Sequence, residues 1–159
     1  MSVPGLSEGS EAPDFELRDQ HGAPVRLSSF RGTRNVLLVF YPYAFSRVCT
    51  GELAALRDAW PAFDRDDRVL LAVSCDSMFS LRAFAEADDL PFPLLSDFWP
   101  HGAVASAYGV LDGDRGCPRR STFVVDRAGR VAWSTHSEMA ESRNLGTYID
   151  VLDALSAEK

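Results

Sequence analysis

The sequence predicts an α/β fold in which a central mixed β-sheet, parallel in its middle, is flanked by helices on both faces. The continuous apolar runs at 35–42 (NVLLVFYP) and 69–75 (VLLAVSC) are typical of strands that are buried on both faces. Each run precedes a segment with helical spacing of its apolar residues, at 50–66 and 79–87. This β-α-β-α order implies that the neighbouring strands are parallel.

The elements before and within this unit follow from local patterns. Residues 1–9 are rich in Ser, Gly and Glu, which predicts a loose N-terminus. FEL (15–17) and VRL (25–27) flank the turn formers of DQHGAP and predict an N-terminal β-hairpin. Pro61 lies inside the 50–66 segment, so we expect the helix to kink or restart there.

The second half of the chain adds further elements in order. The predicted series is a strand at 91–97, a short helix at 101–110, a polar loop at 111–120, a hairpin at 121–136 and a closing helix at 143–155. The hairpin supplies an antiparallel pair at one side of the sheet. A thioredoxin-like fold fits this order, as several other α/β folds would, and the length of 159 residues predicts a single domain over 1–159.

Composition narrows the class of partner. The formal net charge of −7 and the pI of about 4.9 disfavour nucleic acid or an anionic membrane as a partner. No stretch approaches the roughly 20 apolar residues that a membrane span needs. The N-terminal segment also lacks the basic start and apolar centre of a secretory signal, so we interpret the protein as cytoplasmic.

The cysteines and histidines do not predict a metal site. Three cysteines cannot all pair within one chain, and Cys49, Cys75 and Cys117 fit no zinc spacing. His21 and His136 are not at ligand spacing from each other, nor from the remaining histidine, His101. We therefore expect no metal and no cofactor, and each thiol is either inert core filler or a reactive group.

Cys49 stands at the junction between the apolar run 35–42 and the following helix. Loops at the carboxyl ends of strands are where α/β proteins usually bind ligands, and a helix start favours an anion such as a thiolate. A second positive group would be needed for strong activation, and Arg47, Arg119 and Arg120 are the candidates. On position alone, a reactive Cys49 and an inert one are equally supported.

The residues around Cys49 resemble the active-site motif of a known family. Pro42, Ser46 and Cys49 stand as P-x-x-x-S-x-x-C, which is similar to the peroxiredoxin motif, with Ser46 in place of the commoner threonine. RSTFVVD (120–126) resembles the second conserved block of that family and implies that Arg120 is its catalytic arginine. Within the family, PLLSDFWPHGAVASAYGV (93–110) most resembles the AhpE-like one-cysteine subgroup.

The resemblance implies a thioredoxin-like fold of peroxiredoxin type and a thiol-dependent peroxidase. Its substrates would be hydrogen peroxide and organic hydroperoxides, with peroxynitrite as a further candidate. Cys49 would become a sulfenic acid, Ser46 and Arg120 would hold the peroxide, and Pro42 would shield the sulfur. The alternative is a peroxide-sensing thiol switch or interaction protein without efficient turnover. A thioredoxin-type oxidoreductase would need C-x-x-C, but Glu52 occupies the second cysteine position.

The partners follow from the same resemblance. The position five residues after Cys49 is Ala54, so one known resolving cysteine is missing. We therefore expect an external thiol reductant of mycothiol/mycoredoxin or thioredoxin type. Cys117, in the polar loop, is expected to be exposed and is either a candidate resolving cysteine or an inert thiol, whereas Cys75 is expected in the core. The adjacent aromatics Phe98 and Trp99 suit a contact in a homodimer or higher homo-oligomer.

Overall fold

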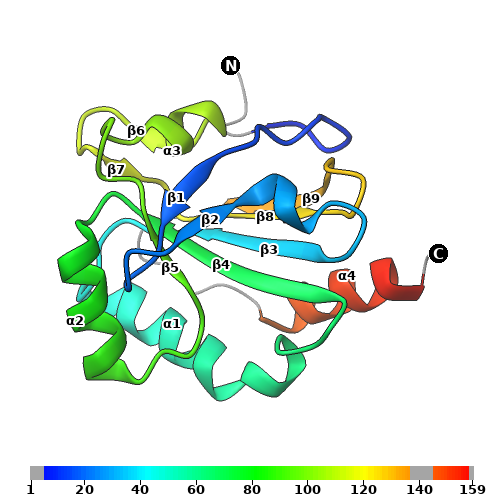
Figure 1. The fold of residues 1–159 in the computed structure, drawn as a ribbon, viewed down its shortest axis with the longest axis horizontal. Coiled ribbons are helices and arrows are strands. Elements are labelled where there is room, and N and C mark those ends of the chain that lie inside the picture. The colour runs from blue at the N-terminus through cyan, green and yellow to red at the C-terminus, as the bar shows by residue number, and fades with distance from the viewer. Residues whose placement is uncertain (1–5, 137–144, 158–159) are drawn as a thin grey trace.

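The computed structural model describes residues 6–136 and 145–157. Among these residues, seven strands form the main sheet in the order β2-β1-β5-β4-β3-β8-β9 (Figure 1). The strands of this sheet are β1 (Glu16–Arg18), β2 (Pro24–Arg26), β3 (Asn35–Phe40), β4 (Arg68–Ser74), β5 (Leu94–Ser96), β8 (Ser121–Val125) and β9 (Val131–His136).

The middle of the sheet is parallel, as the sequence predicts. β3 pairs with β4, and β4 pairs with β5, in parallel register. The predicted antiparallel hairpin, β8 with β9, lies at one side of the sheet. β8 is also antiparallel to β3, and β1 is antiparallel to β5, so antiparallel pairs stand on both sides of the parallel middle. The contact between β1 and β5 involves one register pair, Arg18 with Ser96. Such a short tertiary contact leaves no periodic signal in the sequence.

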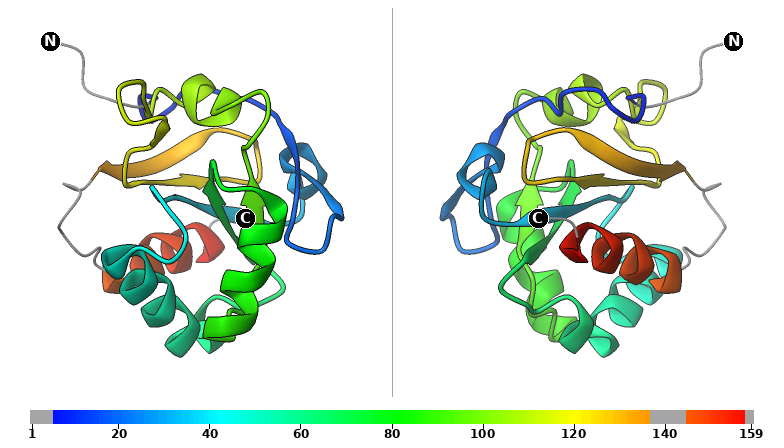
Figure 2. Two further views of the ribbon diagram at one scale, coloured as in Figure 1. Left: turned by 90° about the vertical axis from the view of Figure 1, so that its left-hand side faces the viewer. Right: turned by 90° about the vertical axis from the view of Figure 1, so that its right-hand side faces the viewer.

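Helices cover both faces of the sheet (Figures 1 and 2). The helices are α1 (Arg47–Asp58), α2 (Met78–Asp88), α3 (Ala103–Ala107) and α4 (Leu145–Ala157), with 3₁₀ turns η1 (Leu27–Phe30) and η2 (Trp60–Ala62). Alternate residues of β3 point to opposite faces. Leu37 and Val39 pack in the cluster with α1, α2 and α4, whereas Leu38 and Phe40 pack in the cluster with α3. No helix within the described ranges has the length and apolar character needed to cross a membrane.

Most predicted elements are confirmed, with shifted boundaries. The N-terminal hairpin and the hairpin at 121–136 both form. α1 ends at Asp58 and the chain resumes as η2, which contains Pro61, as expected for a helix interrupted by proline. Residues 143 and 144 of the predicted closing helix lie outside the described residues.

Two segments differ from their predicted character. The predicted loop at 111–120 contains a small antiparallel pair, β6 (Leu111–Asp112) and β7 (Cys117–Pro118). In the predicted loose terminus, residues 1–5 lie outside the described residues. Gly9 already donates its N–H to the carbonyl of Val131, at 2.7 Å.

The topology brings the site together at one end of the sheet. β3, β4 and β5 end on the left of Figure 1, where α1 and α2 begin. Phe40, the last residue of β3, pairs with Ser121, the first residue of β8. Tyr41 onward and Arg120 therefore leave the sheet side by side. This register explains how residues about 70 positions apart in the chain meet at the start of α1.

Candidate active site

Cys49 lies in the first turn of α1, as expected for a thiol at a strand-to-helix junction. Its side chain is only 2% exposed and packs with Val39 and Leu53. Ser46 is the N-cap of the helix, and its hydroxyl accepts a hydrogen bond from the Cys49 N–H at 3.3 Å. The first turn of a helix carries unpaired N–H groups and a partial positive charge, which favour an anionic sulfur or a bound oxygen.

Arg120, the residue before β8, reaches the start of the same helix. The side chain is 1% exposed and forms an ion pair with Glu52. Because residues three apart on a helix share a face, Glu52 lies beside Cys49, and Arg120 is held against the start of α1. Of the three candidate cations, Arg119 is exposed, and the side chain of Arg47 lies outside the described part of the chain.

Glu52 is the residue of this site that sequence reasoning missed. In the sequence, Glu52 is noted only because it stands where a C-x-x-C motif would have its second cysteine. The available signal is its spacing of three residues from Cys49, which places a carboxylate on the same helix face. Since a buried charge needs a partner, this carboxylate indicated that an arginine must come from another element.

The segment between β3 and α1 leads directly into the helix turn that carries Cys49. Pro42, two residues after the end of β3, is buried. The Ala44 N–H donates to the Asp76 carboxylate at 2.7 Å. Phe45 has a φ of 68°, an uncommon conformation for a residue with a side chain. The backbone before Ser46 is thus held in a specific shape.

Cys117 is not exposed, so that prediction is wrong. Its side chain is fully buried in β7, and burial raises the pKa of its thiol. The hydroxyl of Tyr43 donates to the carbonyl of Arg115, two residues before Cys117, at 3.0 Å. The polar composition of 111–120 suggested exposure, but the β6–β7 pair turns Cys117 inward and Tyr43 packs over it.

Cys75 is buried, as expected, just after β4. Burial, with a smaller contribution from the charge of Asp97, raises the pKa of its thiol to about 12. All three cysteines are free thiols. At neutral pH the thiol of Cys75 is protonated, and the raised pKa of Cys117 disfavours its thiolate also, so neither is a ready nucleophile.

The histidines do not form a metal centre. His21 and His101 are exposed, and His136 bonds through Nδ1 to the hydroxyl of Ser121 at 2.6 Å. In the ranges that the structure describes, no group of three or more His, Cys, Asp or Glu side chains is arranged to hold a metal ion.

The sheet order and the capped, buried cysteine with its arginine define a class: a thioredoxin-like α/β protein with a single thiol site at a helix start. The AhpC/TSA family model matches residues 9–134. Alkyl hydroperoxide reductase E of Mycobacterium tuberculosis is 47% identical over 152 residues, which cover 96% of this chain and 99% of that protein. The chain belongs to the AhpC/TSA family, the peroxiredoxins, and is a thiol-dependent peroxidase.

Solved structures agree with this assignment. Peroxidoxin BcpB of M. tuberculosis superposes with a TM-score of 0.80 at 33% identity, covering 97% of this chain and 99% of that one. The reduced 2-Cys peroxiredoxin of Plasmodium vivax superposes with a TM-score of 0.86 at 29% identity, covering 96% and 83%. The predicted fold class and family are confirmed.

Proposed function

We propose that Cys49 is the peroxidatic nucleophile of this peroxidase. Its thiolate attacks the terminal oxygen of a peroxide, so that an S–O bond forms as the O–O bond breaks. The leaving oxygen takes up a proton and departs as water or alcohol, and the sulfur is left as a sulfenic acid. The observation that carries this proposal is the buried ion pair of Arg120 with Glu52. Glu52 and the capped Cys49 both belong to the first turns of α1, so the ion pair holds a cation near the sulfur.

The neighbouring residues have distinct roles in this reaction. Arg120 holds the peroxide oxygens and stabilises the charge that develops as the bond breaks. Ser46 caps the helix at Cys49, and its hydroxyl can hydrogen-bond a peroxide oxygen that binds there. Pro42 is buried and carries no N–H, so it shields the sulfur without adding a competing donor.

The substrates we infer are hydrogen peroxide and organic hydroperoxides, with peroxynitrite as a further candidate oxidant. The name of the mycobacterial relative, alkyl hydroperoxide reductase, supports organic hydroperoxides as a class. The apolar surroundings of Cys49, including Val39 and Tyr41, are compatible with an alkyl substituent.

The experiment is rapid mixing of the reduced protein with one equivalent of hydrogen peroxide or an alkyl hydroperoxide, followed by intact mass. We expect a gain of one oxygen in the wild type and loss of the fast reaction, by about a thousandfold or more, in Cys49→Ser. Fast peroxide consumption that persists in Cys49→Ser would refute the assignment. Sustained turnover with an added thiol separates a peroxidase from a one-shot thiol switch.

We infer that an external thiol returns the sulfenic acid to the thiol. Ala54 stands where one family class has its resolving cysteine. Cys117 is fully buried, and burial raises the pKa of its thiol, so it is a poor attacking thiol while the loop is in place. A mycothiol/mycoredoxin-type or thioredoxin-type system is the proposed reductant.

Intact mass also tests Cys117 as a resolving residue. A disulfide between Cys49 and Cys117 would appear as a loss of two hydrogens after peroxide treatment, absent in Cys117→Ser. The external-thiol proposal expects the gain of one oxygen in both proteins. Cys75→Ser is the matched control, because Cys75 is also a buried free thiol.

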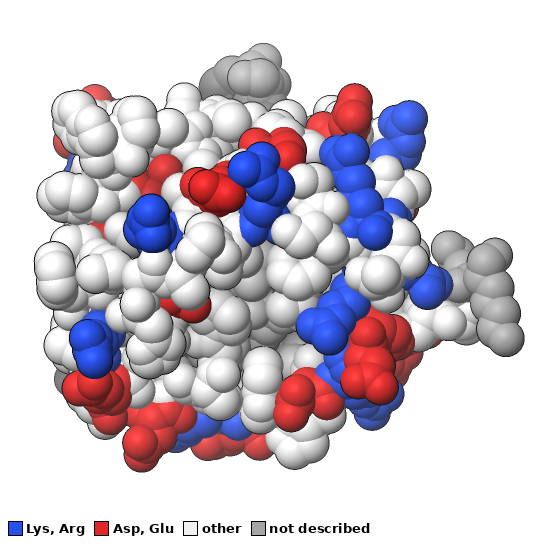
Figure 3. Space-filling view, in the orientation of Figure 1, with Lys and Arg blue, Asp and Glu red and all other residues white. Residues whose placement is uncertain are grey.

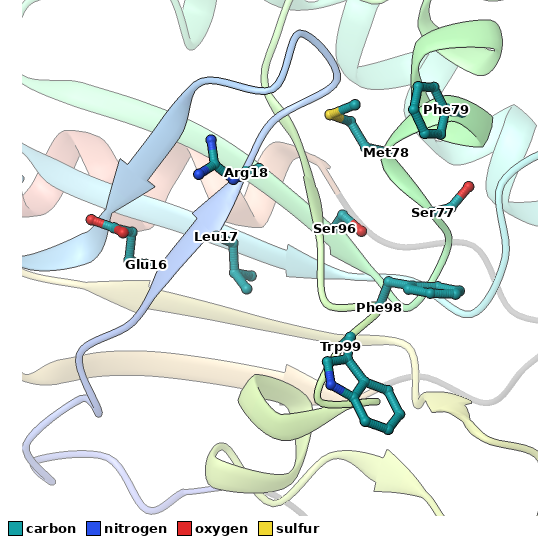
Figure 4. A pocket seen from close by; sticks show the side chains of 9 residues that line it. All are labelled: Glu16, Leu17, Arg18, Ser77, Met78, Phe79, Ser96, Phe98 and Trp99. Atoms are coloured by element: carbon teal, nitrogen blue, oxygen red, sulfur yellow. The ribbon is translucent and has the colours of Figure 1, made fainter.

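We further propose that the protein assembles as a homodimer or higher homo-oligomer through an aromatic groove. The groove has a volume of about 610 Å³. Figure 4 shows Phe98 and Trp99 on one side of it and Met78 and Phe79 on the other. Trp99 is 81% and Phe79 is 74% exposed, and such adjacent apolar side chains are typical of interfaces.

The assembly is tested by light scattering after size exclusion. We expect a dimer or larger species for the wild type and a shift toward monomer for Trp99→Ser. A wild type that is monomeric at micromolar concentration would refute the proposal.

We propose a cytoplasmic location and no nucleic-acid partner. Three free thiols suit a reducing compartment. Basic side chains gather toward the right of the face in Figure 3, with acidic side chains among them. The formal net charge of −7 disfavours a phosphate backbone as a partner.

A further inference from the structure

Asp76, between β4 and α2, joins three segments at the active end of the sheet. One carboxylate oxygen accepts the N–H of Ala44 at 2.7 Å and the hydroxyl of Ser74 at 2.8 Å. The backbone carbonyl of Asp76 accepts the hydroxyl of Ser96 at 2.6 Å. The ends of β4 and β5 therefore fix the carboxylate, and the carboxylate in turn fixes the segment that follows β3.

Ala44 is a position at which one hydrogen bond can control the loop. It lies two residues before Ser46, whose hydroxyl caps α1 at Cys49. The next residue, Phe45, has a φ of 68°, which is costly for a side-chain-bearing residue and needs support from its surroundings. The Phe45 ring is 55% exposed, although its centroid lies 5.0 Å from that of Phe84. A charge-assisted bond beside a strained, exposed residue is well placed to keep the loop closed.

The two half-reactions make opposite demands on this loop. The peroxide step needs an ordered site in which Ser46 and Arg120 are aligned with the sulfur. In this closed arrangement Cys49 is 2% exposed, which leaves room for a small peroxide at most. An external thiol is larger, and it must approach the sulfenic sulfur directly to form a mixed disulfide. It therefore reaches the sulfur only when the loop moves away.

We propose that Asp76 is a positioning residue that holds loop 41–46 closed over Cys49, favouring the peroxide step and limiting access of the larger thiol. This inference rests on Cys49 being the reacting sulfur. Asp76 itself touches the loop backbone and acts on the reaction only through that backbone.

Asp76→Asn and Asp76→Ala test the anchor with two rates measured on the full-length reduced protein. One is the second-order rate constant for hydrogen peroxide, and the other is labelling of Cys49 by a bulky maleimide, located by peptide mass. Removing this charge-assisted hydrogen bond should lower the rate constant for hydrogen peroxide roughly tenfold and raise the rate of maleimide labelling several-fold. A residue that merely stabilises the fold would not move the two rates in opposite directions at an unchanged Tm.

Asp126→Asn is the matched control. Its carboxylate also accepts two loop N–H groups, from Ala128 and Arg130, both at 3.0 Å. It lies in the β8–β9 turn, at the far end of β8 from Arg120. We expect neither rate to change in this variant. Ser74→Ala, which removes the other donor to the same Asp76 oxygen, should shift both rates in the same directions as Asp76→Asn, but less.

Three results would overturn the proposal. Unchanged rates in both Asp76 variants would show that the anchor does not control the loop. A parallel fall of both rates would indicate an effect on the sulfur itself. Labelling that rises equally in Asp126→Asn would indicate general loosening. A wild type that does not consume peroxide would instead refute the role of Cys49, while maleimide labelling would still report on the loop.

Discussion

Arg120 and Glu52 place two opposite charges where almost no water reaches them. A buried pair of this kind is weak evidence for stability, because the desolvation of both ions offsets their attraction. The main effect of this ion pair is to fix the position of the Arg120 side chain. Glu52 orients the planar guanidinium from α1, the helix that also carries Cys49, so the cation and the sulfur are positioned by one rigid element.

Arg120→Lys should lower the rate constant for peroxide by about a hundredfold, the usual effect of removing a preorganised donor from a developing charge. Lysine keeps the charge next to Glu52, so the fold should survive, but it loses the planar fork that arginine presents. Stopped-flow oxidation of the reduced protein measures the effect. Arg119→Lys, at the exposed neighbouring position, should match the wild type. Equal losses in the two variants would contradict the assignment of Arg120.

At the level of elements, α1 and α2 begin in the same way. Ser46 accepts the N–H of Cys49 and Ser77 accepts the N–H of Ser80, so each helix starts with a serine cap three residues before its partner. In α1 the capped N–H belongs to Cys49, the proposed nucleophile, whereas in α2 it belongs to Ser80, which lies outside the proposed site. Substituting each serine cap in turn therefore distinguishes an effect on the stability of the helix from an effect on the rate of peroxide reduction.

Ser46→Ala and Ser77→Ala should each lower the free energy of unfolding by about 1 kcal/mol, the usual value for a lost serine cap. Only Ser46→Ala should also slow peroxide reduction, by roughly tenfold, because it removes the hydroxyl that hydrogen-bonds the Cys49 N–H and is proposed to hydrogen-bond the peroxide. Urea unfolding and stopped-flow oxidation measure the two effects. Ser46→Thr keeps the hydroxyl and adds the stiffening β-branch, so it should retain the rate. A similar loss of rate in Ser77→Ala would attribute the effect to stability alone.

The elements also show which parts of the site a sequence can predict. Pro42, Ser46 and Cys49 lie within one strand-to-helix junction, so their spacing alone predicts a candidate site. Glu52 and Asp76 contact other segments. Spacing places Glu52 on the helix face of Cys49, but no local pattern shows which segments these two carboxylates contact. The polar composition of 111–120 describes the loop as a whole. It could not predict that Cys117 turns inward.

Across the whole molecule, the end of the sheet opposite the site is fastened by a different ionic network. Arg68, at the start of β4, is 3% exposed and bonds to Asp153 of α4 at 2.9 Å. Asp67 accepts a hydrogen bond from Ser156, also in α4, and another from Arg68 at 3.1 Å. The C-terminal helix is thus bound to the sheet by charges as well as by its apolar stripe.

This network should make stability depend on pH. The hydrogen bond from Ser156, and then that from Arg68, lower the pKa of Asp67 below its ordinary value of 3.8. A carboxyl group whose pKa is lowered in the folded state stabilises the fold fully above its unfolded pKa. That contribution is lost as the pH falls through the folded value. The stabilisation should therefore be complete above about pH 5 and should fade below about pH 4.

Asp67→Asn should lower the free energy of unfolding by about 1 to 2 kcal/mol at pH 7, because Arg68 and Ser156 lose a charged acceptor. The difference from the wild type should shrink as the pH falls from 5 to 2.5, since the wild-type carboxyl then becomes protonated as well. Urea unfolding at a series of pH values measures it. Asp64→Asn, at an exposed position in the loop before β4, is the control. Its free energy of unfolding should stay close to that of the wild type at every pH. A difference for Asp67→Asn that is constant between pH 7 and pH 2.5 would show that the carboxylate charge does not fasten α4 to the sheet.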